Sequence, residues 1–415
     1  MTIDWNDTFA KRALKLTASE IRELLKLINQ PDIISFAGGI PDPAFFPYDN
    51  MAAAYAKIFA DPKKRAEALQ YSISEGYTPL RQWIAEHLAT LGIATHADNI
   101  LILNGSQQAL EFLGKLFIGP GDRIIVTNPA YLGALQAFSL YEPEYVTVTL
   151  DETGLDMKAL AREFEKGAKF LYLTPDFGNP SGVTLSLEQR KALLDLAYRH
   201  NIPVIEDTAY EKLRYDGAAV PSLLSLDTSR LNESAPLSDP TSNGHVIYCG
   251  TFSKSIAPAL RIGWVIAPTP VVQKLVLMKQ ASDLHVSTLN QMVMHEVVQE
   301  IIDSHTAKLR DVYRARRDAM LAALEKYMPA GVTWTKPEGG MFVWATLPPH
   351  LDGAALLAAS IEKERVAFVP GAAFFPDRSG RNTIRFAFSL VPPEKIEEGV
   401  KRLARLIGEI SAAAA

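Results

Sequence analysis

The sequence has a single cysteine, little net charge and no long apolar run. One cysteine, Cys249, in 415 residues excludes an internal disulfide framework, which suits a reducing cytoplasm. The net charge of −5 gives no reason to expect nucleic acid or an anionic membrane as a partner. No apolar run approaches the length of a membrane span, and the first residues do not resemble a signal peptide. We therefore expect a cytoplasmic protein with no nucleic-acid or membrane partner.

Helices and apolar strands alternate between residues 76 and 267. This alternation favours an α/β fold with a mainly parallel sheet that is covered on both faces. We count seven strands between residues 100 and 267. The last follows its predecessor too closely for a helical crossover, so it is expected to run antiparallel. The Ser-, Asp- and Pro-rich stretch 216–244 is expected to be a surface insertion.

The pattern changes after residue 270. Long helical segments come first, and a hairpin at 332–344, two more strands and two more helices follow, which predicts a smaller α+β domain. An amphipathic helix is expected at 17–29, ahead of an extended Gly- and Pro-rich segment. The predicted parts are an N-terminal helix and arm over 1–50, a large domain over 51–300 and a small domain over 301–415.

One lysine, Lys254, stands on a small-residue turn after the apolar run 246–248. Partial burial there favours the neutral amine, which can attack a carbonyl group to form a Schiff base. Thr251, Ser253 and Arg261 together offer two hydroxyls and a planar fork to a phosphate. A cofactor with both an aldehyde and a phosphate is pyridoxal phosphate. The alternative is a solvated surface lysine, so the other strand ends must decide.

Polar or aromatic side chains follow most of the predicted strands. Ligands of open parallel sheets bind beyond the carboxyl ends of the strands. Each residue alone has an ordinary structural explanation as a helix cap, a turn or a core aromatic, but together they would surround one ring. They are Ser106 and Gln107 after the first strand, Tyr131 after the second, Asn179 after the fourth, and Asp207 and Tyr210 after the fifth.

Eight short motifs make the chain resemble a known family. They are Ser35 to Pro41, Gln70-Tyr71, Gly105 to Gln108, Asn128 to Tyr131, Pro175 to Gly182, Asp207 to Tyr210, Thr251 to Lys254 with Arg261, and Ile384 to Phe386. With them the chain resembles, over nearly its whole length, the fold-type I pyridoxal-phosphate enzymes of the class I/II aminotransferases. Within that family it is similar to the 2-aminoadipate and kynurenine aminotransferases.

The resemblance implies roles for these residues. Lys254 would form the internal aldimine and move the proton, Asp207 would pair with the pyridine nitrogen, and no metal is expected. Tyr71 would reach the phosphate in a neighbouring subunit, which implies a homodimer with shared sites. Asn179 and Tyr210 would hydrogen-bond the ring oxygen, Tyr131 would stack on the ring, and Ser106, Gln107, Thr251, Ser253 and Arg261 would hold the phosphate.

The substrate side of the site rests on fewer residues. The resemblance implies that Arg385 binds the substrate α-carboxylate as a bidentate pair, helped by Asn179 and by the backbone at Gly39. Arg22, on the predicted helix 17–29, is a candidate for a distal carboxylate, with a solvated helix arginine as the alternative. Relatives often carry a larger polar residue at the position of Gly178, so we expect a wider or looser pocket here.

These residues predict an aminotransferase that moves an amino group between an L-amino acid and a 2-oxo acid, such as 2-oxoglutarate or pyruvate. The reaction would be ping-pong, through the Lys254 aldimine. One alternative is a lyase on the same fold, which would eliminate or decarboxylate. Another is a regulator that only senses the cofactor. Such regulators carry a DNA-binding domain ahead of this one, whereas here the catalytic-type domain is expected to start near residue 10.

Overall fold

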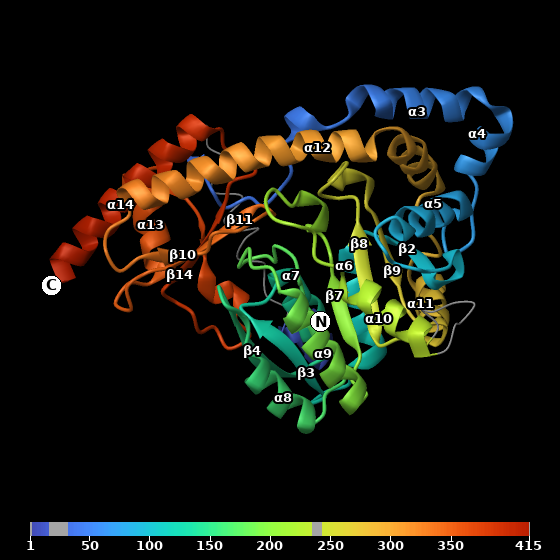
Figure 1. Ribbon diagram of the computed structural model, residues 1–415, viewed down its shortest axis with the longest axis horizontal. Coiled ribbons are helices and arrows are strands. Elements are labelled where there is room, and N and C mark those ends of the chain that lie inside the picture. Colours follow the sequence, from blue (N-terminus) through green and yellow to red (C-terminus); the bar gives the residue numbers. More distant parts are fainter. Residues whose placement is uncertain (1, 16–31, 235–242, 415) are drawn as a thin grey trace.

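The computed structural model of the chain describes residues 2–15, 32–234 and 243–414 (Figure 1). The helix predicted at 17–29, and Arg22 with it, lie outside the described residues. A large α/β part and a smaller part with its own antiparallel sheet lie beneath one long helix.

The large sheet has eight strands in the order β2-β9-β8-β7-β6-β3-β4-β5. All seven predicted strands are present, and β9 runs antiparallel to both β2 and β8, as predicted. The eighth strand, β5, is a two-residue antiparallel edge strand that the hydrophobic pattern did not reveal. The strands are β2 (Ile100–Asn104), β3 (Arg123–Asn128), β4 (Glu144–Asp151), β5 (Gly154–Leu155), β6 (Leu171–Leu173), β7 (Val204–Asp207), β8 (Val246–Thr251) and β9 (Ile262–Ile266).

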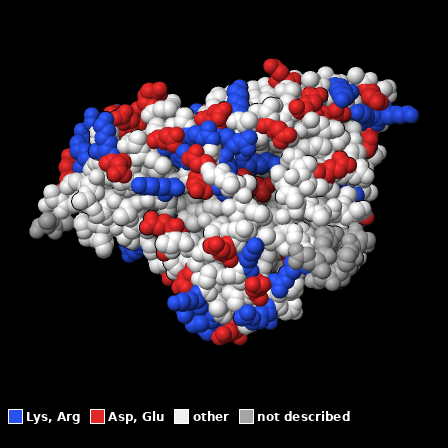
Figure 2. All heavy atoms as spheres, viewed as in Figure 1, with Lys and Arg blue, Asp and Glu red and all other residues white. Residues whose placement is uncertain are grey.

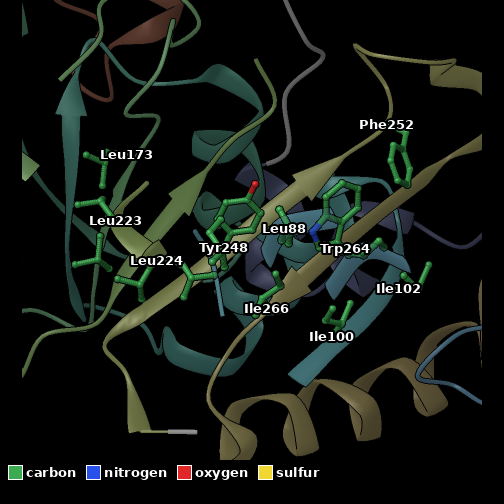
Figure 3. Close-up of a cluster of buried hydrophobic side chains, with 14 of the residues drawn as sticks. Leu88, Ile100, Ile102, Leu173, Leu223, Leu224, Tyr248, Phe252, Trp264 and Ile266 are labelled. Atoms are coloured by element: carbon green, nitrogen blue, oxygen red, sulfur yellow. The ribbon is translucent and has the colours of Figure 1, made fainter. Parts of the chain in front are cut away.

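The sheet is buried on both faces. Side chains alternate along a strand, so Ile100 and Ile102 of β2 enter one apolar core while Leu101 and Leu103 enter the other. Figure 3 shows Ile100 and Ile102 beside Trp264 in the first of these cores. The helices of this part are α5 (Thr78–Ala89), α6 (Ser106–Phe117), α7 (Leu132–Ser139), α8 (Met157–Glu165), α9 (Leu187–His200), α10 (Leu223–Ser234) and α11 (Thr269–Ser282).

The expectation of a surface insertion over 216–244 is wrong where α10 begins. Leu223 and Leu224 are buried in the core (Figure 3). Their backbone N–H groups donate to the carboxylate of Glu206, at 2.7 and 2.9 Å. A carboxylate at a helix N-terminus satisfies the first free N–H groups. The composition of the stretch did not show this because Glu206 precedes it in the chain.

The smaller part contains the predicted hairpin and further strands. Strands β10 (Thr333–Trp334), β11 (Phe342–Thr346), β14 (Thr383–Ala387) and β13 (Val369–Pro370) form an antiparallel sheet in that order. Strand β1 (Ile34–Ser35), from the N-terminal arm, pairs in parallel with β12 (Val366–Ala367). Helices α13 (Gly353–Lys363) and α14 (Pro393–Ala414) complete this part.

Helix α12 (Thr288–Tyr327) joins the two parts (Figure 1). Its residues up to Ile302 pack in the core of the large part, and those from Leu309 onward pack in the core of the small part. The boundary predicted between residues 300 and 301 falls inside this helix, and the domain ranges remain a prediction. The remaining α-helices are α1 (Trp5–Thr8), α3 (Tyr48–Ala60) and α4 (Pro62–Ala68). Among the described residues, no helix combines the length and apolarity needed to cross a membrane.

Candidate active site

Lys254 lies just beyond the carboxyl end of β8, on the turn that leads towards β9. Its Nζ donates to the carbonyl oxygen of Gly39 at 3.2 Å and lies 5.9 Å from the ring centroid of Tyr210. Burial, together with the positive charges of Arg385 and Arg261, lowers the pKa of Lys254 to about 8. A fraction of Lys254 is therefore a neutral amine near neutral pH, and this form can act as a nucleophile or a base.

Asp207 ends the neighbouring strand, β7, and is 4% exposed. Its Oδ2 accepts a hydrogen bond from the hydroxyl of Tyr172 at 2.9 Å, while its buried Oδ1 has no partner. Burial raises the pKa of Asp207 to about 6, and the bond from Tyr172 opposes that rise. A buried carboxylate oxygen without a partner is costly, so this atom suits a ligand that brings a donor.

Asn179 and Arg385 join the two parts of the chain at the site. Nη1 of Arg385, on β14, donates to Oδ1 of Asn179 at 2.8 Å, and Nη2 donates to the carbonyl oxygen of Ala37 at 2.6 Å. The side chain of Tyr210 also interacts with Asn179, and burial raises the pKa of Tyr210. Burial lowers the pKa of Arg385 to about 10, and its buried Nε has no partner. The guanidinium is thus placed to take an anionic group.

The start of α6 and the side chain of Arg261 meet across two glycines. A Cβ on Gly105 would lie 2.3 Å from Nη2 of Arg261, and one on Gly263 would lie 2.6 Å from the backbone nitrogen of Ser106. Only glycine permits this approach. Arg261 therefore lies over a helix N-terminus, where free N–H groups and the helix dipole favour a phosphate.

Two hydroxyls and an amide extend this anion-binding arrangement. The hydroxyl of Thr251 donates to Oγ of Ser253 at 2.9 Å, and the backbone N–H of Ser253 donates back to Thr251 at 3.1 Å. Nε2 of Gln107 donates to the carbonyl oxygen of Gly133 at 2.7 Å. The hydroxyl of Tyr131 lies 3.5 Å from Oε1 of Gln107, and burial raises the pKa of Tyr131 to about 12.

The predictions for Tyr71 and Gly178 receive less support from the structure. Tyr71 is 78% exposed, and its ring contacts His285 rather than the residues around Lys254. A Cβ on Gly178 would lie 3.2 Å from the carbonyl oxygen of Thr174, closer than an ordinary van der Waals contact. The structure therefore does not test whether Gly178 widens the pocket.

Sequence reasoning missed Tyr172. Its hydroxyl donates a hydrogen bond to Oδ2 of Asp207. The signal was available, because a buried tyrosine usually finds a hydrogen-bond partner for its hydroxyl. A second missed group is Lys279, which is fully buried and donates to Gln108 at 2.8 Å and to Asp283 at 2.9 Å.

The residues present fit pyridoxal phosphate. The unpartnered Oδ1 of Asp207 suits a protonated ring nitrogen, and the amine of Lys254 suits an aldehyde. The cradle formed by Gly105, Arg261 and the α6 N-terminus suits a phosphate.

Comparison with known proteins agrees with this geometry. The family model described as "Aminotransferase class I and II" matches residues 32–403. The chain belongs to this family. It is 44% identical to aromatic-amino-acid aminotransferase 1 of Thermococcus litoralis, over 98% of this chain and 96% of the relative. It is 41% identical to a 2-aminoadipate transaminase of Thermus thermophilus, over 98% of each chain.

Solved structures of aminotransferases have the same fold. An α-aminoadipate aminotransferase from Thermus thermophilus, complexed with N-(5'-phosphopyridoxyl)-L-leucine, superposes with a TM-score of 0.89 at 40% identity, covering 99% of this chain and all of that one. A kynurenine aminotransferase from Pyrococcus horikoshii gives a TM-score of 0.90 at 41% identity, over 98% of each chain. The fold-type I prediction is confirmed, and the chain is a pyridoxal-phosphate-dependent aminotransferase.

Proposed function

We propose that this aminotransferase moves an amino group from an L-amino acid to 2-oxoglutarate or pyruvate by means of the residues at the strand ends. The observation that carries the proposal is the unpartnered Oδ1 of Asp207 on the strand next to the one that leads to Lys254. A carboxylate that lacks a donor and an amine with a lowered pKa are what a pyridine aldehyde requires.

Pyridoxal phosphate, when bound, supplies an aldehyde that captures the substrate amine and a protonated ring that accepts the electrons of the Cα–H bond. Nζ of Lys254, once free, takes the Cα proton and returns it, because its lowered pKa keeps the neutral amine available. The negative charge of Asp207 keeps the ring nitrogen protonated. Tyr172 stabilises that charge through its hydrogen bond to Oδ2.

The other residues bind and orient the two molecules. Ser106, Gln107, Thr251, Ser253 and Arg261 would hold the phosphate. Tyr131 would stack on the ring, and Asn179 and Tyr210 would contact the ring oxygen. Arg385 would bind the α-carboxylate, helped by Asn179 and the backbone at Gly39. Two parallel N–H···O bonds from one guanidinium fix both the position and the angle of a carboxylate.

We further propose a homodimer in which Tyr71 serves the partner's site. Its side chain is 78% exposed, and Leu69 and Ile73 beside it are 68% and 50% exposed. Large apolar side chains clustered on a surface mark a contact with another chain. Tyr71 would complete the phosphate site of the second subunit, so neither subunit would be complete alone.

The test is a panel of amino donors, offered with 2-oxoglutarate or pyruvate, in which the oxo acid product and the cofactor absorbance are both followed. Amino transfer should appear with at least one pair and should require both substrates. Release of carbon dioxide or of an elimination product without amino transfer would instead indicate the lyase. Absence of any turnover, with the cofactor bound, would indicate the regulator. Arg22 remains a candidate for a distal carboxylate, and Arg22→Ala should selectively weaken dicarboxylic donors.

A further inference from the structure

A second cavity lies between the two parts of the chain, and two of its lining residues, Glu211 and Lys212, also line the small pocket at Lys254. Its volume is about 750 Å³, within the range of small-molecule sites. The end of α5, the short helix η4 (Glu211–Leu213) and the middle of α12 line it, and Asn179 and Arg385 do not. Figure 2 shows Lys and Arg side chains, with Asp and Glu side chains among them, on the surface beneath the long helix of Figure 1.

Lys212 of η4 forms one wall of this cavity. Its Nζ lies 2.7 Å from Nε2 of His87, and within the described ranges it makes no ion pair. Burial lowers the pKa of Lys212, the charges of Glu211 and Asp303 oppose that shift, and the charge of Arg310 adds to it. A poorly solvated ammonium group without a close carboxylate is costly, so a bound anion would relieve that cost.

Arg310 of α12 lines the same cavity. Its guanidinium makes no hydrogen bond or ion pair with any residue that the structure describes, and its charge adds to the field that acts on Lys212. Two cations from different elements thus border one cavity, and neither forms an ion pair with a carboxylate among the described residues. A planar guanidinium beside an ammonium group is a common way to hold an oxyanion.

Of the carboxylates that line the cavity, Asp176 and Glu211 interact with other groups, and Asp303 acts on Lys212 only through its charge. Asp176 is paired with Arg190 at 2.8 Å and with Arg214 at 3.2 Å. Glu211 accepts a hydrogen bond from a tyrosine of β8 at 2.7 Å. Asp303 is exposed. The cations that remain available to a ligand are therefore Lys212 and Arg310.

We propose that this cavity is a second binding site, which holds a small oxyanion, a phosphate or carboxylate group, between Lys212 and Arg310. The bound oxyanion would be connected to the active site through the protein backbone. Lys212 comes two residues after Tyr210, and Arg214 is paired with Asp176, which lies in the turn that carries Asn179. The site would also lie where α12 passes from one apolar core to the other.

The experiment measures how fast trinitrobenzenesulfonate labels Lys212 in the holoenzyme, by peptide mass spectrometry. Separate arms contain inorganic phosphate, succinate or neither. At ten times its dissociation constant, a bound anion should slow the labelling about tenfold, because only the free site reacts. Slowing by phosphate alone assigns a phosphate ligand, and slowing by succinate alone assigns a carboxylate. Equal rates in all three arms would overturn the proposal.

A matched pair of variants on α12 tests the assignment. Arg310→Gln should abolish the protection, while Lys308→Gln, an exposed position outside the cavity lining, should keep it. Calorimetric titration of the holoenzyme with phosphate or succinate gives a second readout that does not depend on labelling. Undiminished protection and binding in Arg310→Gln would show that the guanidinium holds no ligand and would refute the site as proposed. Neither measurement depends on the proposed substrates.

Discussion

The hydroxyl of Tyr172 donates to Oδ2 of Asp207 at 2.9 Å and leaves Oδ1 free. This bond lies between two adjacent strands, β6 and β7, and both residues are buried. A hydrogen bond to an ionised carboxylate favours the charged form, so the pair maintains the negative charge that a ring nitrogen needs.

Tyr172→Phe should move the acid limb of the kcat–pH profile to higher pH. The lost bond to a charged group is worth about 1.5–3 kcal/mol, or about one to two pKa units. The pKa of Asp207, already raised to about 6 by burial, would rise further, so the ionised form would be lost sooner as the pH falls. The measurement is kcat at a series of pH values from about 5 to about 9, which cover both sides of the pKa of about 6.

The matched control is Tyr248→Phe. Tyr248, on β8 beside β7, is equally buried, and its hydroxyl donates to Glu211 at 2.7 Å. The Tyr248→Phe variant should be less stable than the wild type, and the acid limb of its kcat–pH profile should not shift. Identical profiles for Tyr172→Phe and the wild type would show that the bond does not control the charge of Asp207.

Gly105→Ala should weaken cofactor binding and lower Tm. Gly105 has φ 76° and ψ 165°, a region that is essentially restricted to glycine and costs other residues about 1–3 kcal/mol. The added Cβ would also lie 2.3 Å from Nη2 of Arg261 and displace the guanidinium. Absorbance titration gives the dissociation constant of the cofactor.

Gly121→Ala is the control for backbone strain at a glycine that lies outside the anion site. Gly121 has φ 79°, but its Cβ would meet nothing within 4 Å. This variant should lower Tm and leave cofactor affinity unchanged. Equal loss of affinity in both variants would mean that Arg261 does not hold the phosphate.

Much of the fold could be predicted from the pattern of apolar residues, because strands that are buried on both faces appear as continuous apolar runs in the sequence. The buried start of α10 was missed, because Glu206, whose carboxylate accepts from its first N–H groups, precedes it in the chain by some distance. Lys254 and Asp207 could be predicted as site residues because both follow strands, and the carboxyl ends of parallel strands lie at one edge of a sheet. Tyr172 was missed because its role depends on which strand pairs with β7, and no local pattern reports that pairing.

Arg385→Lys should lower kcat/KM for amino acids by about 10- to 100-fold, mainly through KM. The lysine keeps the charge but cannot form the paired bonds now made to Asn179 and Ala37. Losing one charge-assisted bond costs about 1.5–3 kcal/mol, which corresponds to that range. Steady-state kinetics with varied donor concentration measures the effect. Arg381→Lys, whose side chain is 77% exposed, is the control and should behave as the wild type.

Lys254→Ala should abolish the absorbance band of the Schiff base between Lys254 and the cofactor and reduce turnover by more than about 10³-fold, because both the capture of the aldehyde and the proton transfer are lost. Lys274→Ala, at an exposed position of α11, should retain both. Unchanged absorbance in Lys254→Ala would remove this residue from its role.

Mixing two inactive variants should restore activity if Tyr71 completes the partner's site. Lys254→Ala lacks the amine, and Tyr71→Ala lacks the exposed ring. In a mixed dimer, one site combines the intact Lys254 of the Tyr71→Ala chain with the intact Tyr71 of the other chain, while the second site carries both defects. Random exchange between symmetric dimers should then restore about one quarter of the wild-type rate. Mixing Lys254→Ala with Arg385→Ala is the control, since Lys254 and Arg385 serve the site of their own chain and each site of the mixed dimer therefore keeps one defect. If the Tyr71 mixture stays as inactive as its parents although subunits exchange, Tyr71 does not serve the partner's site.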